Sequence, residues 1–236
     1  MRAYDLMGLF DKSTAIGDSP LLKGFTDWHC HILPGVDDGI KTVEDSLSVL
    51  ALYEKAGIRE VWLTPHIMED IPNKTAYLRS VFDGLCRQYG GGIKLNLASE
   101  NMLDSLFEDR LEAGELLPYS GHRLLVETSY FNPPNNFREL LDRVAAKGYF
   151  PVLAHPERYM YMQHDDYLRL KDRGVLFQLN IPSLYGAYGP EVQEKAEKIL
   201  GEGLYDLSGT DLHREPSFRH MLEAKLKAKT IKRIPA

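Results

Sequence analysis

Short apolar runs alternate with amphipathic segments from Phe25 onward. Seven of these runs have strand character, and they are FTDW from Phe25, EVWLT from Glu60, IKLNLA from Ile93, RLLVE from Arg123, PVLA from Pro151, VLFQLN from Val175 and LYDLSG from Leu204. Strands that alternate with helices pair in parallel through right-handed crossovers. The pattern therefore predicts an α/β fold in which seven parallel strands close a TIM-like barrel, slightly smaller than the eight-stranded form.

Six segments between these runs have the spacing of helices. The first, Val43–Ala56, has Thr42 as a predicted N-cap, ends at Gly57, and is expected to be a surface helix with one buried stripe. The segment 136–147 carries apolar residues at helical spacing before Gly148 and is the clearest helix of the chain. The remaining helices are predicted over 75–89, 165–173, 190–200 and 216–228.

The length of 236 residues and the hydrophobic content of 44% suit one domain of the barrel class. Residues 1–24 mix Gly, Ser, Pro and charged residues without a sustained period, so they are predicted to be an N-terminal extension. Residues 25–236 are predicted to form the domain itself. The extension could be a loose tail or a docking segment, and the sequence does not decide between the two.

Composition restricts the compartment and the class of partner. The formal net charge of -6 argues against a protein that binds nucleic acid through a broad basic surface. Cys30 and Cys86 are too few for a disulfide framework and favour a reducing compartment. No apolar stretch approaches the roughly 20 residues that span a bilayer, and the N-terminus lacks the pattern of a signal peptide. A cytoplasmic protein without membrane insertion is expected.

The strongest local signal is the run Asp27-Trp28-His29-Cys30-His31 at the end of the first predicted strand. Residues two apart in a strand point to the same side, about 6.6 Å apart at roughly 3.3 Å per residue, so His29 and His31 can converge on one ion. Cys30 then faces away and is expected to pack in the interior. A single His-x-His is equally compatible with a histidine pair that binds no metal.

The other strand ends change that balance, because six of the seven carry a histidine or a carboxylate. These further residues are His66, Glu100, Glu127, His155, Asp211 and His213. In parallel barrels the carboxyl ends of the strands form the active face. Five of the eight histidines fall on this face, which scattered core histidines would not do. Imidazoles together with carboxylates suit Zn, Mn or Fe(II), so the sequence predicts a catalytic metal centre.

Several candidates have a plainer interpretation. Asp37 and Asp38 precede Gly39 and could be turn residues, although Asp38 lies close enough to the first motif to be a ligand. Glu100 and Glu127 could cap helices or pair with basic groups, but a charge that directly follows an apolar strand needs a strong partner. Arg158 could form a surface ion pair, yet its position three residues after His155 favours anion binding.

Three motifs together resemble a known family: HCHILPGVDDG from His29, TPH ending at His66, and HPERY from His155. They are similar to the polymerase and histidinol phosphatase (PHP) superfamily, and within it to the bacterial protein-tyrosine-phosphatase branch of the CpsB/YwqE type. The resemblance extends from about Phe25 to His213. It implies a distorted seven-stranded barrel, the PHP fold, that holds two to three divalent metal ions, with Mn expected and Fe or Zn as alternatives.

The resemblance also implies a ligand set for each metal. One ion would lie among His29, His31, Glu100 and Asp211. A second would lie among Glu100, Glu127 and His155, and a third among Asp38, His66 and His213. The residues expected to act in catalysis are Arg158, Asp38 and His66.

The implied activity is hydrolysis of phosphotyrosine by hydroxide that the metals activate, with Arg158 and the metals stabilising the phosphoryl oxygens. The implied partner is a phosphotyrosine protein, a bacterial tyrosine kinase in capsule or exopolysaccharide regulation. Two alternatives stay open: a small-molecule phosphatase, such as one acting on histidinol phosphate, and a non-catalytic module that recognises a phosphoprotein. Neither cysteine begins a Cys-x5-Arg phosphate loop, which disfavours a cysteine phosphatase. The oligomeric state is not predicted.

Overall fold

The computed structural model describes residues 12–235, and its parallel strands lie in two sheets. The six-stranded sheet has the order β10 (Leu207–Gly209), β9 (Leu176–Asn180), β8 (Phe150–Ala154), β7 (Arg123–Glu127), β6 (Glu100–Met102) and β4 (His66–Ile67). The three-stranded sheet has the order β2 (Thr26–Cys30), β3 (Glu60–Leu63) and β5 (Lys94–Leu97). Every strand pair within these two sheets is parallel, as the alternating pattern predicts.

The predicted count of seven barrel strands is not confirmed, because two of the predicted strands are each followed by a further strand in the other sheet. Thr64 and Pro65 separate β3 from β4, and Ala98 and Ser99 separate β5 from β6. Proline has no backbone N–H to donate, so the ladder is interrupted where Pro65 stands. His66 and Glu100 consequently begin β4 and β6 and do not end the strands that precede them.

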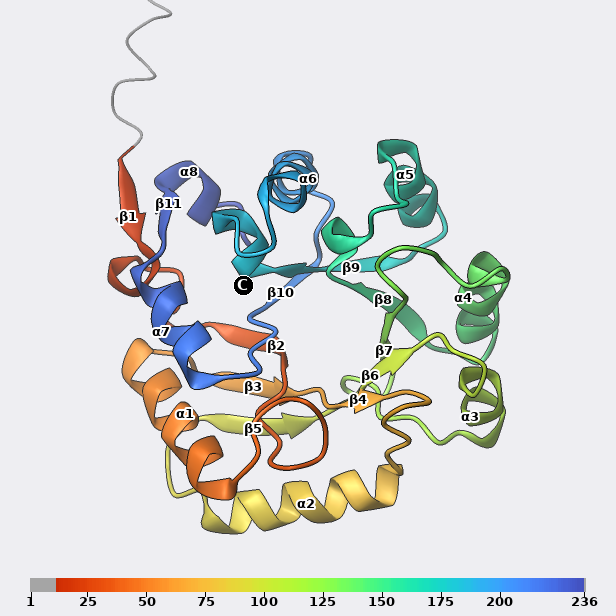
Figure 1. The fold of residues 1–236 in the computed structure, drawn as a ribbon, viewed down its shortest axis with the longest axis horizontal. Helices are drawn as coiled ribbons and strands as arrows, with labels where there is room; N and C mark the ends of the chain where they lie inside the picture. The colour runs from red at the N-terminus through yellow and green to blue at the C-terminus, as the bar shows by residue number, and fades with distance from the viewer. Residues whose placement is uncertain (1–11, 236) are drawn as a thin grey trace, which may run out of the picture.

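The two sheets curl around a common centre, and helices cover the outside (Figure 1). Strand β10 approaches β2, because Asp211 N donates to His29 O at 2.7 Å and His31 N donates to Leu212 O at 2.9 Å. A parallel bridge joins Cys30 and Leu212 at the same point. The first and last parallel strands are therefore neighbours, and the residues that follow them share one edge.

The helices follow the predicted segments closely, with one addition and one division. They are α1 (Val43–Ala56), α2 (Thr75–Gln88), α3 (Phe107–Ala113), α4 (Phe137–Ala146), α5 (His164–Asp172), α6 (Pro190–Gly201), α7 (Glu215–Glu223) and α8 (Ala228–Ile231). The helix α3 was not predicted. The helix predicted over 216–228 ends at Glu223, and the chain continues as strand β11 (Lys225–Lys227) before α8. The alternation of exposed lysines with buried Leu226 is the strand period that the prediction missed.

Helix α1 begins and ends where its capping residues require. Thr42 has extended backbone, and its side-chain hydroxyl accepts a hydrogen bond from Asp45 N at 3.1 Å. Gly57 lies in the left-handed region at φ 100°, which only glycine adopts readily. The cap fixes the point at which the loop after His31 turns back into a helix.

Residues 12–24 lie against the domain. Strand β1 (Ser13–Ala15) pairs antiparallel with β11, and Ile16 in the short 3-10 helix η2 (Ile16–Asp18) is fully buried. The described part of the predicted extension is thus held against the C-terminal part of the domain by an antiparallel pair of strands. Residues 1–11 lie outside the described residues.

The interior has an outer and an inner apolar layer. Most buried apolar residues pack between the strands and the helices in one large cluster. A smaller cluster, with Trp62, Leu125, Val152 and Leu207, is built from alternate residues of the strands and therefore lies on the inner face of the curled sheets. Leu125 and Glu127 are two residues apart in β7, so their side chains point to the same inner face. This face is apolar at Leu125 and ends in the carboxylate of Glu127 at the open edge.

No helix within residues 12–235 is both long enough and apolar enough to cross a membrane.

Candidate metal centre

The carboxylate of Glu100 lies at the centre of the predicted ligands. Its Oε2 is 3.1 Å from His29 Nε2, 3.3 Å from His31 Nε2 and 3.1 Å from His66 Nδ1. Its other oxygen, Oε1, lies 3.0 Å from His155 Nε2. One buried carboxylate therefore contacts four imidazoles from three segments of the chain: the end of β2, the start of β4 and the residue after β8.

Asp211 and Glu127 flank this centre and contact different histidines. Asp211 Oδ1 lies 3.5 Å from His29 Nε2 and 3.4 Å from His31 Nε2. Glu127 Oε1 lies 3.0 Å from His66 Nδ1, and its Oε2 lies 3.8 Å from His155 Nε2.

An outer group lies nearer to solvent. His66 Nε2 and His213 Nε2 are 3.6 and 3.4 Å from Asp38 Oδ1, and the side chain of Asp38 is 64% exposed. The two nitrogens of His66 thus face different groups, Nδ1 the buried carboxylates and Nε2 the exposed one. All nine predicted ligands are brought together, and three overlapping subsets have their ligand atoms within 4.8 Å of one another.

The buried polar atoms of this centre fit divalent cations. Four of them have no hydrogen-bond partner, namely His66 Nδ1, Glu100 Oε2, Glu127 Oε1 and His155 Nδ1. In addition, the Nε2 atoms of His29 and His31 face each other at 3.1 Å. A buried polar atom without a partner costs about 1–3 kcal/mol, and a cation between these nitrogens and oxygens would satisfy several of them at once.

The pKa values in the centre point the same way. Burial alone would lower the pKa of His29, but the carboxylates of Glu100 and Asp211 raise it to about 9. Burial would raise the pKa of Glu100, yet the neighbouring histidines His29 and His66 hold it well below its usual range. The pocket therefore favours positive charge among these groups, as a proton or as a metal ion.

Two side chains that the sequence did not mark as ligands orient the first two histidines. His29 Nδ1 lies 2.8 Å from Gln178 Oε1, and His31 Nδ1 lies 2.8 Å from Asp37 Oδ2. An acceptor at Nδ1 holds the proton there and leaves Nε2 with its lone pair directed into the centre. Asp37 was weighed as a turn residue, and it accepts from Gly39 N as such a residue does. Gln178 carries a weaker signal, an isolated amide inside the apolar run of β9.

A buried aspartate holds the strand ends in place. Asp27 accepts hydrogen bonds from Thr210 N at 2.8 Å, from the Thr210 hydroxyl at 2.7 Å and from the Tyr53 hydroxyl at 2.9 Å. These bonds tie the start of β2 to the residue before Asp211. Asp27 was quoted with the first motif but given no role.

The backbone at two ligands has an unusual conformation. His155 and Asp211 have φ of 34° and 51°, in the left-handed region that residues other than glycine seldom adopt. Such conformations cost on the order of 1–3 kcal/mol each and persist where the surroundings hold them. At Gly209 an added Cβ would lie 2.6 Å from His29 Cβ, so only glycine allows β10 this close to β2.

Arg158 is held between two aromatic rings at the edge of the centre. Its guanidinium lies 4.4 Å from the centre of the Tyr130 ring and 4.2 Å from that of Tyr188. Its Nη1 donates to Asp211 Oδ2 at 2.8 Å, and Asn180 Nδ2 donates to the same oxygen at 2.9 Å. Tyr130 and Tyr188 also line the cavity in front of the centre.

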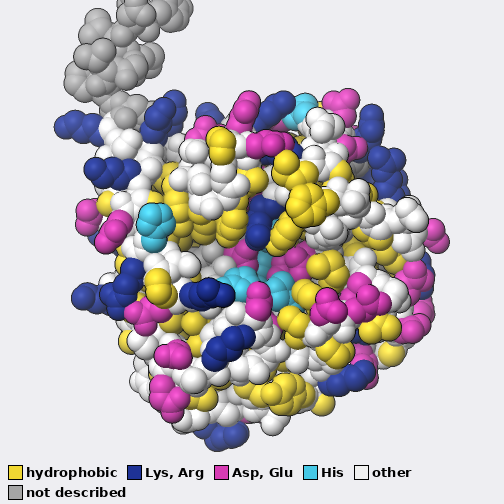
Figure 2. Space-filling view, in the orientation of Figure 1, with side chains coloured by type: hydrophobic (Ala, Val, Ile, Leu, Met, Phe, Trp, Pro, Cys, Tyr) yellow, Lys and Arg dark blue, Asp and Glu magenta, His cyan; other side chains and the backbone are white. Residues whose placement is uncertain are grey.

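The centre forms the floor of an open cavity of about 780 Å³. Figure 2 shows histidine and acidic side chains gathered at a hollow in this face of the molecule. Arg214 and His220, which lie beyond the ligands in the sequence, line the cavity as well. Cys30 is fully buried with its Sγ 3.5 Å from Trp62 O, as expected for a residue that packs in the interior.

A family model described as capsular polysaccharide synthesis, CpsB/CapC, matches residues 25–233. The chain belongs to this family. The match confirms the resemblance inferred from the three motifs, and it covers every predicted ligand.

Named relatives are similar over most of the chain. Tyrosine-protein phosphatase YwqE of Bacillus subtilis is 28% identical over 194 residues, which are 79% of this chain and 76% of YwqE. Tyrosine-protein phosphatase CpsB of Streptococcus pneumoniae is 27% identical over 207 residues, 79% of this chain and 82% of CpsB.

Solved structures agree with these relatives. A crystal structure from work on YwqE of Bacillus subtilis and CpsB of Streptococcus pneumoniae, described as unique metal-dependent tyrosine phosphatases, has a TM-score of 0.76 and 26% identity, and the match covers 82% of this chain and 81% of that one. The phosphotriesterase homology protein from Escherichia coli has a TM-score of 0.53 at 12% identity, over 90% of this chain and 96% of that one. The second match supports the fold alone.

Proposed function

We propose that this protein is a metal-dependent protein-tyrosine phosphatase of the CpsB/CapC family. The observation that carries the proposal is the buried cluster around Glu100, in which four histidines and flanking carboxylates lie beside an arginine in an open cavity. The relatives YwqE and CpsB are named tyrosine-protein phosphatases, and the related crystal structures are described as metal-dependent ones.

The proposed ligands form three groups. His29, His31, Glu100 and Asp211 form the first, Glu100, Glu127 and His155 the second, and Asp38, His66 and His213 the third. His66 also contacts the second group, because its Nδ1 faces Glu100 and Glu127. Two to three divalent ions, with Mn expected and Fe or Zn as alternatives, would lower the pKa of water and offset the negative charge of the phosphoryl group.

The residues of the chain would supply orientation and charge. Arg158 has a planar fork of N–H donors that suits two phosphoryl oxygens, and the two tyrosine rings restrict the plane of that fork. Asp211 and Asn180 fix its direction. The leaving phenolate has a conjugate acid with a pKa near 10, so the site needs no dedicated strong acid.

The finer architecture that we propose is a closed barrel of seven strand positions. In this count, β3 with β4 forms one interrupted strand, and β5 with β6 forms another. The contact between β2 and β10 supports this closure. The proposed substrate is a phosphotyrosine protein, a bacterial tyrosine kinase in capsule or exopolysaccharide regulation, and the proposed compartment is the cytoplasm.

The test is phosphate release from a phosphotyrosine peptide by the protein as purified, after chelation, and after Mn is restored. Activity should disappear on chelation, return with Mn, and fall in both His155→Ala and Arg158→Ala. Histidinol phosphate assayed in parallel separates a small-molecule phosphatase. A metal-loaded protein that binds the peptide and releases no phosphate would instead be a recognition module.

A further inference from the structure

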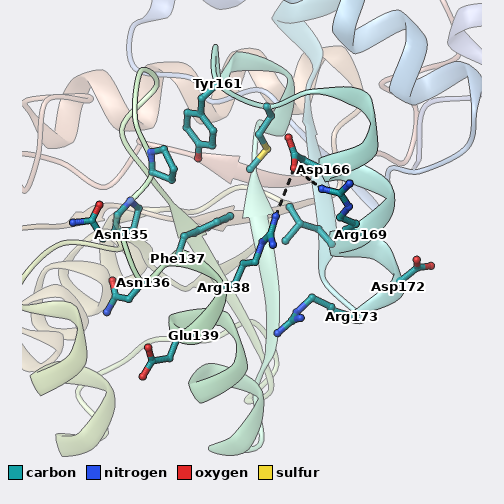
Figure 3. A pocket seen from close by; sticks show the side chains of 14 residues that line it. Asn135, Asn136, Phe137, Arg138, Glu139, Tyr161, Asp166, Arg169, Asp172 and Arg173 are labelled. Carbon is teal, nitrogen blue, oxygen red and sulfur yellow. Dashed lines mark ion pairs between the residues drawn. The ribbon is translucent and has the colours of Figure 1, made fainter.

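A second cavity of about 680 Å³ lies between the start of α4 and the helix α5 (Figure 3). One side is the loop with Pro133 and Pro134, and the other side is formed by residues 161–173. It shares no lining residue with the catalytic cavity, and the proposed reaction does not use it. We call it the α4–α5 groove.

The groove and the catalytic cavity lie on the two sides of the same pair of segments. One segment follows Glu127, and the other follows His155. They are joined by a hydrogen bond of 2.6 Å between the Thr128 and Tyr161 hydroxyls and by one of 2.8 Å from Met160 N to Tyr130 O. Tyr161 lines the groove, whereas Tyr130 lines the catalytic cavity. A polypeptide that placed one side chain in the cavity could therefore continue into the groove.

The surface at this junction is apolar and open. Phe131 is 72% exposed and Met160 is 40% exposed, although both belong to the large apolar residues that folding normally buries. Phe131 follows Tyr130 directly, and Met160 bonds to Tyr130 through its backbone. Exposed aromatic and methionine side chains are frequent at protein interfaces, so this junction suits a bound chain.

Two arginines face the groove with much of their hydrogen-bonding capacity free for a ligand. The side chains of Arg138 and Arg169 are each 61% exposed, and each has a nitrogen 3.7 Å from Asp166 Oδ1. That separation is too long for a hydrogen bond. Asp166 Oδ2 accepts from Gln163 N at 3.0 Å, so this carboxylate also serves as part of the capping box of α5.

Three arginines and three acidic residues line the groove, and they differ in orientation. In Figure 3 the guanidinium groups of Arg138 and Arg169 lie toward the middle of the cavity beside Asp166, whereas Glu139 and Asp172 point away from it. Arg173 lines the lower side and pairs with Asp142. At the middle of the groove, two guanidinium groups share the single carboxylate of Asp166, in a protein of formal net charge -6. Guanidinium groups in this arrangement match carboxylates, which they bind through two parallel hydrogen bonds.

We propose that the α4–α5 groove holds an acidic segment of the protein substrate, next to the phosphotyrosine on the same polypeptide. This proposal rests on the proposed function. Asp or Glu side chains of the substrate would take the donors of Arg138 and Arg169, while its backbone crosses the Phe131–Met160 junction. The groove would thereby select among phosphotyrosine sequences, and the metal centre would hydrolyse whichever one is presented.

The test compares three substrates: a phosphotyrosine peptide with Asp and Glu flanks, a peptide of the same length with Asn and Gln flanks, and p-nitrophenyl phosphate. In the double variant R138Q/R169Q, kcat/KM for the acidic peptide should fall roughly threefold to tenfold, since each exposed ion pair contributes modestly. The values for the neutral peptide and for p-nitrophenyl phosphate should stay at the wild-type level. The control is R87Q, which removes one exposed arginine from α2, outside both cavities.

A charge reversal distinguishes binding from a general disturbance of the fold. R138E should disfavour the acidic peptide and favour a peptide with Lys flanks, and both effects should shrink in 1 M salt, where the Debye length is about 3 Å. Equal kcat/KM for all three peptides in wild-type protein would overturn the groove proposal while leaving the phosphatase intact. Absence of hydrolysis of every substrate by the metal-loaded protein would instead overturn the proposed function.

Discussion

The inner and outer parts of the candidate metal centre are built differently. His29 and His31 are fully buried, and each has a second side chain at Nδ1, Gln178 for the first and Asp37 for the second. In the outer part, the side chain of Asp38 is 64% exposed and that of His213 is 27% exposed. Protein side chains therefore hold the orientation of His29 and His31, whereas Asp38 and His213 can relax into solvent. We therefore expect inner variants to lose more metal and activity than outer ones.

The largest effect is expected from His29→Ala. This substitution removes the nitrogen that lies 3.1 Å from Glu100 Oε2 and 3.5 Å from Asp211 Oδ1, and with it one proposed ligand of the first ion. Phosphatase activity should fall on the order of 100-fold or more, because losing even a residue that merely supports a ligand typically costs 10–100-fold. Metal content by elemental analysis and phosphate release measure it. His220→Ala is the matched control, since His220 lines the same cavity but belongs to none of the ligand groups; equal losses in both variants would contradict the assignment.

A smaller effect is expected from Asp38→Asn. The substitution keeps the shape of the side chain and removes the charge that faces His66 and His213. Activity should fall about tenfold, and excess Mn should restore part of it because the outer group loses affinity while the inner one keeps its ligands. A titration of activity against Mn concentration measures this, and an unchanged midpoint would remove Asp38 from the ligand set.

The smallest effect is expected from Gln178→Leu. This variant keeps the bulk on the inner face of β9 but removes the acceptor that orients His29. Metal affinity should fall by about tenfold or less, with little change in kcat once Mn is saturating. Isothermal titration with Mn and thermal unfolding of the metal-free protein separate orientation from stability. A lower unfolding temperature with unaltered affinity would mean that Gln178 acts only in packing.

The extent of prediction differed between elements for physical reasons. The helix α1 was predicted over its full length, because a side-chain cap and a glycine stop are local signals. The division of 216–228 into α7, β11 and α8 was missed, since β11 exists through its pairing with β1 from the other end of the chain. The interruption after Leu63 was also missed, although Pro65 carried the signal for it.

The site shows the same division between local and distant information. All nine ligand candidates lie together, since each lies near the end of a strand, at the start of one or in the loop after one, and the ends of parallel strands meet at one edge. The partners Gln178 and Asn180 were not singled out as part of the centre, because their role depends on which strands are neighbours. The sequence also did not predict that the two nitrogens of His66 contact different carboxylates. These contacts depend on the position of His66 at the start of β4, whereas it was expected at the end of the preceding strand.

The sequence by itself determined the kinds of groups in the centre and their order along the chain. Both the alternation of strands with helices and the identity of the ligand side chains can be recognised in short stretches of sequence. The tertiary structure decided which atoms share a centre, which nitrogen of each histidine faces it, and that the α4–α5 groove lies beside the cavity. These depend on the curl of the sheets, which brings Asp211 within hydrogen-bonding distance of the backbone of His29 across most of the chain. No local pattern specifies that approach, because it results from the packing of all the strands together.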